Sequence, residues 1–355
     1  MVHRKKQTEK LLIEHYQLYP ELQIKDIFKF LYQSSFGCEH LAMDLDNTIR
    51  RIDTEMAECQ LHRGKLIEAL DGEFCRVHLD WIKSGLSAET LGKLFVRSAV
   101  SVENGKELLE EKLSVFEEMV SKEELPFAID EVKEEIGIWR EDGYPACRHS
   151  EKYRSNYLPA YRVIKKEYAT FLPLFLKIDS ALKKGAVNLA VEGGSASGKT
   201  TLSQMLQEVY GATVFHMDDF FLRPWQRTAE RFSQPGGNVD WERFLEEVLV
   251  PLKNREAINY KRFNCSTLTL EPAISLLPSK LNIIEGAYSM HPELAEYYNL
   301  SVFLDVSPQL QEKRIGKRNS SVIAKRYLEE WIPMEHLYFE KMRVKEKCDI
   351  VINIR

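Results

Sequence analysis

The chain has 355 residues, of which 44% are hydrophobic and 29% are charged, so it can bury two ordinary hydrophobic cores and we expect two domains. Its formal net charge of -5 argues against a nucleic-acid partner, because proteins that bind polyanions usually carry an excess of basic residues. The basic first residues precede no apolar signal region, and no apolar stretch is long enough to span a bilayer. These features argue against secretion and a membrane partner and predict a cytoplasmic protein.

The six cysteines are scattered and include no C-x-x-C pair. This distribution suits reduced thiols better than a disulfide framework or a zinc site. We expect most of them to be buried as small apolar residues. They are Cys38, Cys59, Cys75, Cys147, Cys265 and Cys348.

The first half of the chain reads as a mainly α-helical domain over residues 1–184. Ile24, Ile27, Phe28 and Leu31 have the i, i+3, i+4, i+7 spacing of one buried helical face. Gly and Pro separate further predicted helices, which cover residues 41–58, 88–100, 107–124 and 157–184. Residues 73–81 alternate in polarity, which fits a short strand, a helix or an ordered loop.

Three segments of this half concentrate His, Arg and Glu between the predicted helices: residues 36–40, 76–78 and 147–150, the last followed by Tyr153, Arg154 and Tyr157. Such groups could form a second anion or metal site, or serve as hydrogen-bonding residues of the fold. Their spacing matches no standard metal motif. The half resembles no family that we can name, and its role stays open.

From about residue 185 the pattern changes to short β-branched runs that alternate with helical stretches, which is typical of a parallel sheet flanked by helices. Strands are predicted at residues 187–192, 212–217, 281–285, 300–306 and 349–354. Helices are predicted at 199–210 and 240–252, and a long charged region covers 308–345. We therefore expect an α/β domain over residues 185–355.

The first of these strands leads into a G-x-x-x-x-G-K-[ST] run, residues 193–200, followed by an amphipathic helix. The glycines let backbone N–H groups turn inward at a helix N-terminus and cradle phosphates. Lys199 would reach the outer phosphates and Thr200 would offer its hydroxyl to Mg²⁺. The pattern predicts ATP and Mg²⁺ as cofactors, with nucleotide bound by Gly193, Gly194, Ser195, Ala196, Ser197, Gly198, Lys199, Thr200 and Thr201.

Carboxylates follow two other predicted strands. Asp218 and Asp219 come after the second strand, where a carboxylate could accept the proton of an attacking hydroxyl or could merely cap a turn. Glu285 ends the strand at 281–285, the position of a Walker-B acid that holds Mg²⁺. The D-x-x-G and N-K-x-D motifs expected of a GTPase do not occur in the chain, which favours a kinase.

From about residue 185 onward the chain resembles the uridine kinase and phosphoribulokinase family of P-loop kinases. The resemblance rests on GGSASGKTTLS (193–203), on HMDDFF (216–221), which also resembles nicotinamide riboside kinases, on IIEG (283–286) and on CDIVI (348–352). It implies that Asp218 is the general base, that Glu285 serves Mg²⁺ and that the acceptor is an alcohol of a nucleoside-like or other sugar-bearing small molecule.

The same resemblance suggests acceptor-binding and lid residues. Asp240 matches the family's acceptor-binding Asp, Tyr260 lies in a run similar to the segment that lines the acceptor pocket, and Asp219 adjoins the base. Arg314 and Arg318 resemble the arginines of a lid that closes over the phosphates, with Arg326 as a third candidate. A run of Lys and Arg on a helix could equally be a solvated face.

Two features depart from the family. Its base-reading residues are not recognisable, and the loop over residues 223–237 has no counterpart that we can match. Arg223, Arg227 and Arg231 in this loop would suit an acceptor with its own negative charge, so Arg231 joins the predicted substrate-binding residues.

The sequence thus predicts a phosphotransferase with an alcohol group as acceptor. A competing hypothesis is a regulatory switch that binds nucleotide in one half and a partner protein in the helical half. A third hypothesis makes the helical half a separate enzyme. The identity of the acceptor and the oligomeric state, including a homo-oligomer, stay open.

Overall fold

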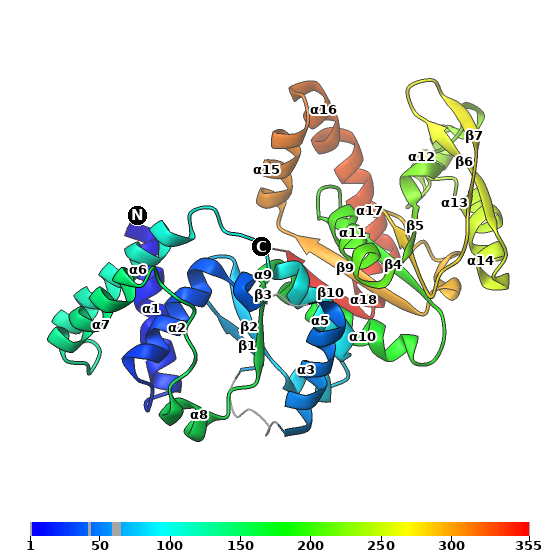
Figure 1. The fold of residues 1–355 in the computed structure, drawn as a ribbon. Helices are drawn as coiled ribbons and strands as arrows, with labels where there is room; N and C mark the ends of the chain where they lie inside the picture. The colour runs from blue at the N-terminus through cyan, green and yellow to red at the C-terminus, as the bar shows by residue number, and fades with distance from the viewer. Residues whose placement is uncertain (1, 42–43, 59–64, 355) are drawn as a thin grey trace. The chain divides into compact units, whose positions relative to one another are not determined.

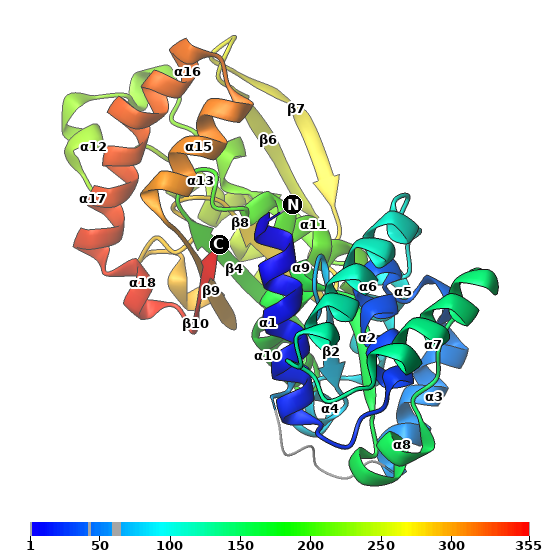
Figure 2. The ribbon, with the colours of Figure 1, turned by 90° about the vertical axis from the view of Figure 1, so that its left-hand side faces the viewer.

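A computed structural model describes residues 2–41, 44–58 and 65–354. The chain divides into two compact units, Met1–Leu176 and Lys177–Arg355 (Figures 1 and 2). The sequence placed the boundary a few residues later, between residues 184 and 185. Helix α10, Leu172–Leu182, runs across the division and leads directly to the first strand of the second unit.

The first unit is rich in helices, as predicted. Ile24, Ile27, Phe28 and Leu31 are all buried in α2, so the spacing identified the inward face of this helix correctly. The helices of the unit before α10 are α1 (Val2–Leu18), α2 (Ile24–Phe36), α3 (Leu45–Glu58), α4 (Asp80–Lys83), α5 (Ala88–Ser98), α6 (Gly105–Ser121), α7 (Ile129–Glu141), α8 (Glu151–Tyr157) and α9 (Lys166–Thr170).

A small antiparallel sheet accompanies these helices, in the order β1 (Ile67–Ala69), β2 (Phe74–His78), β3 (Tyr161–Lys165). The ambiguous run at 73–81 therefore contains a strand. The helix predicted over 157–184 is wrong at its start: α8 ends at Tyr157, Leu158 adopts φ 44°, and Pro159 cannot continue a helix. Val163 and Ile164 are buried where β3 pairs with β2.

The second unit contains a five-stranded parallel sheet in the order β10-β9-β4-β8-β5. Every strand predicted for this unit is confirmed: β4 (Val187–Gly193), β5 (Thr213–His216), β8 (Leu281–Glu285), β9 (Leu300–Val306) and β10 (Ile350–Ile354). The central strands are almost wholly buried, as expected of a parallel sheet covered on both faces. Helix α11 (Lys199–Tyr210) packs on β4, β5 and β8.

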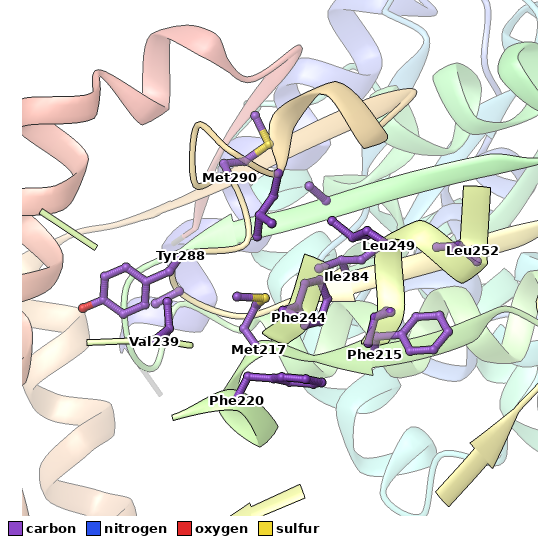
Figure 3. Packing of buried hydrophobic residues seen from close by; sticks show 14 of the residues in the cluster. Phe215, Met217, Phe220, Val239, Phe244, Leu249, Leu252, Ile284, Tyr288 and Met290 are labelled. Carbon is purple, nitrogen blue, oxygen red and sulfur yellow. The ribbon is translucent and has the colours of Figure 1, made fainter. Parts of the chain in front are cut away.

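The predicted helix at 240–252 is built from α13 (Trp241–Phe244), a π-helical turn (Leu245–Leu249) and α14 (Val250–Asn254). Its inner side joins the core around β5 and β8, where Phe215, Phe220, Phe244 and Ile284 lie together (Figure 3). This packing fixes the turn after β5 on the core. The charged region at 308–345 forms α15 (Pro308–Arg318), α16 (Ser321–Arg326), a π-helical turn (Tyr327–Trp331) and α17 (Ile332–Met342), before α18 (Val344–Lys347).

An antiparallel hairpin, β6 (Ile258–Asn264) and β7 (Thr269–Leu276), was not predicted. A short helix, α12 (Ala229–Ser233), lies in the loop after β5. Within the described residues, no helix is long and apolar enough to cross a membrane.

Candidate active site

The P-loop joins the end of β4 to the first turn of α11. Gly193 has φ 148° and Gly198 has φ 104°, a region that favours glycine. A Cβ on Gly193 would also lie 2.7 Å from the carbonyl oxygen of Leu304. Ala196 adopts φ 58°, which is strained for a residue with a side chain. The loop therefore has one tightly specified conformation.

Lys199 folds back over this loop. Its Nζ donates hydrogen bonds to the carbonyl oxygens of Gly193 at 2.8 Å and Gly194 at 3.0 Å. The hydroxyl of Ser197 is fully buried and has no hydrogen-bond partner among the described residues. Together with the unpaired N–H groups of the first turn of α11, this arrangement fits the phosphates of a nucleotide.

Thr200 and Glu285 face each other across the ends of α11 and β8. The Thr200 hydroxyl lies 3.5 Å from Glu285 Oε1, and both are oxygen ligands of the kind that Mg²⁺ prefers beside phosphates. His216, which pairs in register with Glu285, places its Nδ1 2.6 Å from the same carboxylate oxygen. This hydrogen bond raises the pKa of His216 above its ordinary value.

Asp218 lies in a 3₁₀ turn, Met217–Phe220, that follows β5. Solvent reaches its side chain, but the protein around the carboxyl group limits its hydration and raises its pKa. The charge of Glu285 adds to the increase, and the positive charges of Lys199 and His216 oppose it. The structure thus brings Asp218, Lys199 and Glu285 together at the carboxyl ends of β4, β5 and β8.

The next residue, Asp219, points to the hairpin. It accepts a hydrogen bond from the hydroxyl of the buried Tyr260 at 3.0 Å and lies 3.3 Å from Arg262 Nε. Two residues that were predicted separately, Asp219 and Tyr260, therefore form one contact. Arg262 was not predicted to belong to it, although it stands in the same run as Tyr260.

Asp240 is buried at the start of α13, where it caps the helix by accepting from the Arg243 N–H at 3.4 Å. Its Oδ2 lies 3.3 Å from Arg223 Nη2 and 3.5 Å from Arg243 Nε. All three residues line a cavity of about 620 Å³ that also contains Trp225 and Arg231. The acceptor-binding role of Asp240 stays a prediction, and its carboxylate already has two cationic neighbours.

The arginines of this loop bind groups of the protein itself. Arg231 forms two hydrogen bonds with Glu242, at 2.6 and 2.7 Å, and donates to the carbonyl oxygens of Gly237 and Val239. Arg227 donates to the carbonyl oxygen of Leu222. The cavity is lined by more carboxylates than guanidinium groups.

The candidate lid arginines differ in their surroundings. Arg314 on α15 donates to the carbonyl oxygens of Ala196 at 3.0 Å and Ser197 at 3.4 Å. Arg318, in the last turn of α15, is exposed, and Arg326 pairs with Glu330 on the surface. Arg314 is thus the candidate that the structure places on the P-loop.

Two acids near the P-loop were missed. Glu335 on α17 is buried and accepts hydrogen bonds from the N–H and the hydroxyl of Ser195. Glu192 at the end of β4 is fully buried and accepts from the N–H groups of Gly193 and Met290 and from the Tyr338 hydroxyl. Burial raises the pKa of Glu335 above its ordinary value and that of Glu192 to about 7.

Comparison with known proteins indicates a family that part of this chain resembles. Residues 189–319 match the sequence model of the phosphoribulokinase / uridine kinase family. The second unit resembles this family over these residues. The relatives include uridine kinases of Mycoplasma pneumoniae, 27% identical over 48% of this chain and 85% of that protein, and of Chlamydia pneumoniae, 26% identical over 46% and 80%. Both names denote phosphotransferases that act on an alcohol group.

Among solved structures, a protein titled a possible uridine kinase from Bacillus stearothermophilus aligns with a TM-score of 0.37 and 22% identity over 51% of this chain and 99% of that one. The two curated relatives leave about half of the chain unmatched, and the family model leaves more than half unmatched.

In the first unit, several of the residues singled out from the sequence lie in one buried network of hydrogen bonds. Arg76 is fully buried and contacts Glu68 and Gln33, and His78 contacts the same Glu68. His149 bridges Asp26 and the hydroxyl of Tyr161. His40, by contrast, is exposed.

The described residues contain no cluster of three or more His, Cys, Asp or Glu side chains arranged to hold a metal ion. Of the described cysteines, all free, Cys38 and Cys75 are buried, Cys147 and Cys348 are half-buried and Cys265 is exposed. Cys59 lies outside the described residues.

Proposed function

We propose that the chain is an ATP- and Mg²⁺-dependent kinase that transfers the γ-phosphoryl group to an alcohol of a nucleoside-like or other sugar-bearing small molecule. The observation that supports this proposal most directly is the position of Asp218. Its carboxyl group lies within electrostatic reach of the P-loop Lys199 and of Glu285, so one acid is available for the acceptor in addition to the one that would serve the metal.

Asp218 and Lys199 have separate roles in the proposed reaction. Asp218 takes the proton of the acceptor hydroxyl while that oxygen bonds to the γ-phosphorus and the bond to the β,γ-bridging oxygen breaks, so that ADP leaves. Its raised pKa makes it a better proton acceptor than an ordinary Asp. Lys199 turns from the Gly193 and Gly194 carbonyl oxygens to the phosphates.

Thr200 and Glu285 would hold Mg²⁺, whose charge neutralises the negative charge that develops on the phosphate oxygens. Arg314 already donates to carbonyl oxygens of the P-loop and is the first candidate to stabilise charge on the phosphates, and Arg318 is proposed to join it when phosphates are present. Asp219, Tyr260, Asp240 and Arg231 shape the acceptor side.

The test is a screen of nucleosides, ribosides, vitamins and sugar phosphates for acceptor-dependent release of ADP. The proposal expects at least one acceptor to stimulate turnover in the presence of Mg²⁺, and Asp218→Asn to abolish that stimulation. Asp142→Asn, an exposed position in the first unit, is the matched control and should keep full activity. Nucleotide binding without stimulation by any acceptor would instead favour a regulatory switch.

A further inference from the structure

Side chains of two helices that lie more than a hundred residues later in the chain form hydrogen bonds with the P-loop. Gln311 and Arg314 on α15 donate to the carbonyl oxygens of residues 195–197. On α17, Glu335 accepts from the Ser195 N–H at 2.9 Å and from the Ser195 hydroxyl at 2.5 Å. Ser195 is therefore bound on its donor side by one helix and on its acceptor side by the other.

A second contact from α17 lies one turn further along. The hydroxyl of Tyr338 donates to Glu192 at 3.2 Å, and Glu192 accepts from the N–H of Gly193 at 2.8 Å. Because residues three apart on a helix share a face, Glu335 and Tyr338 hold the first residues of the P-loop from the same side. Both side chains are buried, so these hydrogen bonds are sheltered from water.

Ala196 lies between these hydrogen-bonded positions and has an unfavourable backbone conformation. Ala196 adopts φ 58°, and such a conformation persists in a residue with a side chain only where its surroundings enforce it. Gln311 holds the Ser195 carbonyl oxygen, which belongs to the peptide just before Ala196, and Arg314 holds the carbonyl oxygen of Ala196 itself. Glu335 holds the N–H of Ser195, one peptide earlier. Gln311, Arg314 and Glu335 thus hold the backbone on both sides of the turn.

We infer that Glu335 is a positioning residue of the phosphate site: it takes up the Ser195 donors and so holds the loop in the turn that leaves the first N–H groups of α11 facing the phosphates. The inference rests on the proposed nucleotide site. It adds that hydrogen bonds connect both α17 and the arginine-bearing α15 to the P-loop.

The experiment measures the dissociation constant for Mg²⁺·ATP by calorimetry, without an acceptor, in the full chain. Glu335→Ala should weaken binding about tenfold or more, because two hydrogen bonds to a buried charged group are lost. Glu335→Gln keeps a carbonyl acceptor and should recover most of the affinity. Glu340→Ala, an exposed glutamate on the same helix, should bind as the natural protein does.

A double-mutant cycle with Ser195→Ala separates positioning from a general loss of stability. If Glu335 acts through Ser195, the effects of Glu335→Ala and Ser195→Ala on the dissociation constant are not additive. Additive effects, or binding by Glu335→Ala within twofold of the natural protein, would overturn the inference. Because the assay needs no acceptor, a failure of the acceptor screen leaves this test intact, and absence of nucleotide binding in the natural protein would refute both proposals.

Discussion

Arg231 and Glu242 form a two-point ion pair: the guanidinium donates to both carboxylate oxygens, at 2.6 and 2.7 Å. The remaining Arg231 donors reach the carbonyl oxygens of Gly237 and Val239. An arginine so fully engaged stabilises the loop over residues 223–237 and offers little to an anionic ligand. The ion pair therefore argues against Arg231 as the residue that would bind a negatively charged group on the acceptor.

We expect Arg231→Ala to raise the KM of neutral and negatively charged acceptors by the same factor, since the variant disturbs the loop and not a charge contact. The Arg231 side chain is mostly buried and Glu242 is about half-exposed, so the loss of stability should be about 1–3 kcal/mol. The measurement compares KM for a riboside and for a carboxylated analogue of it. A selective loss for the carboxylated compound would instead support Arg231 as a direct ligand of an anionic acceptor.

Glu285 should determine the requirement for Mg²⁺. Glu285→Gln removes the negative charge beside Thr200 while preserving shape, and we expect the Mg²⁺ concentration for half-maximal turnover to rise about tenfold or more. Titration of MgCl₂ at saturating ATP measures this concentration. Asp305→Asn, at the end of β9 and paired with Lys345, is the control. An unchanged Mg²⁺ curve for Glu285→Gln would exclude the metal-binding role.

The sequence was most informative where local pattern and chemistry coincide. The buried strands of the parallel sheet are short β-branched runs, and the P-loop follows one of them directly. Asp218 and Glu285 could be predicted because parallel strands bring their carboxyl ends to one edge. The register of β5 on β8, in which His216 pairs with Glu285, shows that these strand ends meet.

What escaped prediction depends on contacts between distant segments. Glu335 and Ser195 are 140 residues apart, and nothing in a charged helix distinguishes the one glutamate that turns inward. The strands β6 and β7 lack a Gly-containing turn between them. The burial of β6 alternates only up to the irregularity between Lys261 and Phe263, and β7 is half-exposed and contains Pro272. The strand β3 stands between two helices and is defined only by pairing with β2.

Glu192 should make the stability of the second unit depend on pH. Burial raises its pKa in the folded state from the ordinary value of 4.5 to about 7, so the folded state binds the proton more tightly than the unfolded one. The stabilisation is fully present below the unfolded pKa and is lost as pH rises through about 7. The difference corresponds to about 3 kcal/mol at alkaline pH.

Glu192→Gln carries no titratable group at this position, so its free energy of unfolding should change less between pH 5 and 8, roughly the interval between the two pKa values. Urea unfolding of both proteins across this range measures the change. The difference between the two slopes isolates Glu192 from other groups, such as Asp218 and Glu335, whose pKa values are also raised. Parallel slopes would contradict the assignment.

Arg76 should be indispensable to the first unit. It is fully buried, donates to Glu68 and Gln33, and lies over the ring of Tyr161 at 4.7 Å. Arg76→Met keeps much of the volume but removes the charge that faces Glu68, and leaving a buried carboxylate without its cation costs about 3–5 kcal/mol. Arg154→Ala, an exposed arginine of the same unit, should cost less than about 0.5 kcal/mol.

Thermal unfolding followed by circular dichroism should show the Arg76→Met loss in the first unit while the second unit still binds Mg²⁺·ATP with unchanged affinity. This separation follows from the division of the chain into two compact units, each with its own core. If Arg76→Met lost nucleotide affinity as well, the two units would fold as one cooperative body. If it kept full stability, the network around Glu68 would have to be maintained by His78 and Tyr19 without the guanidinium group.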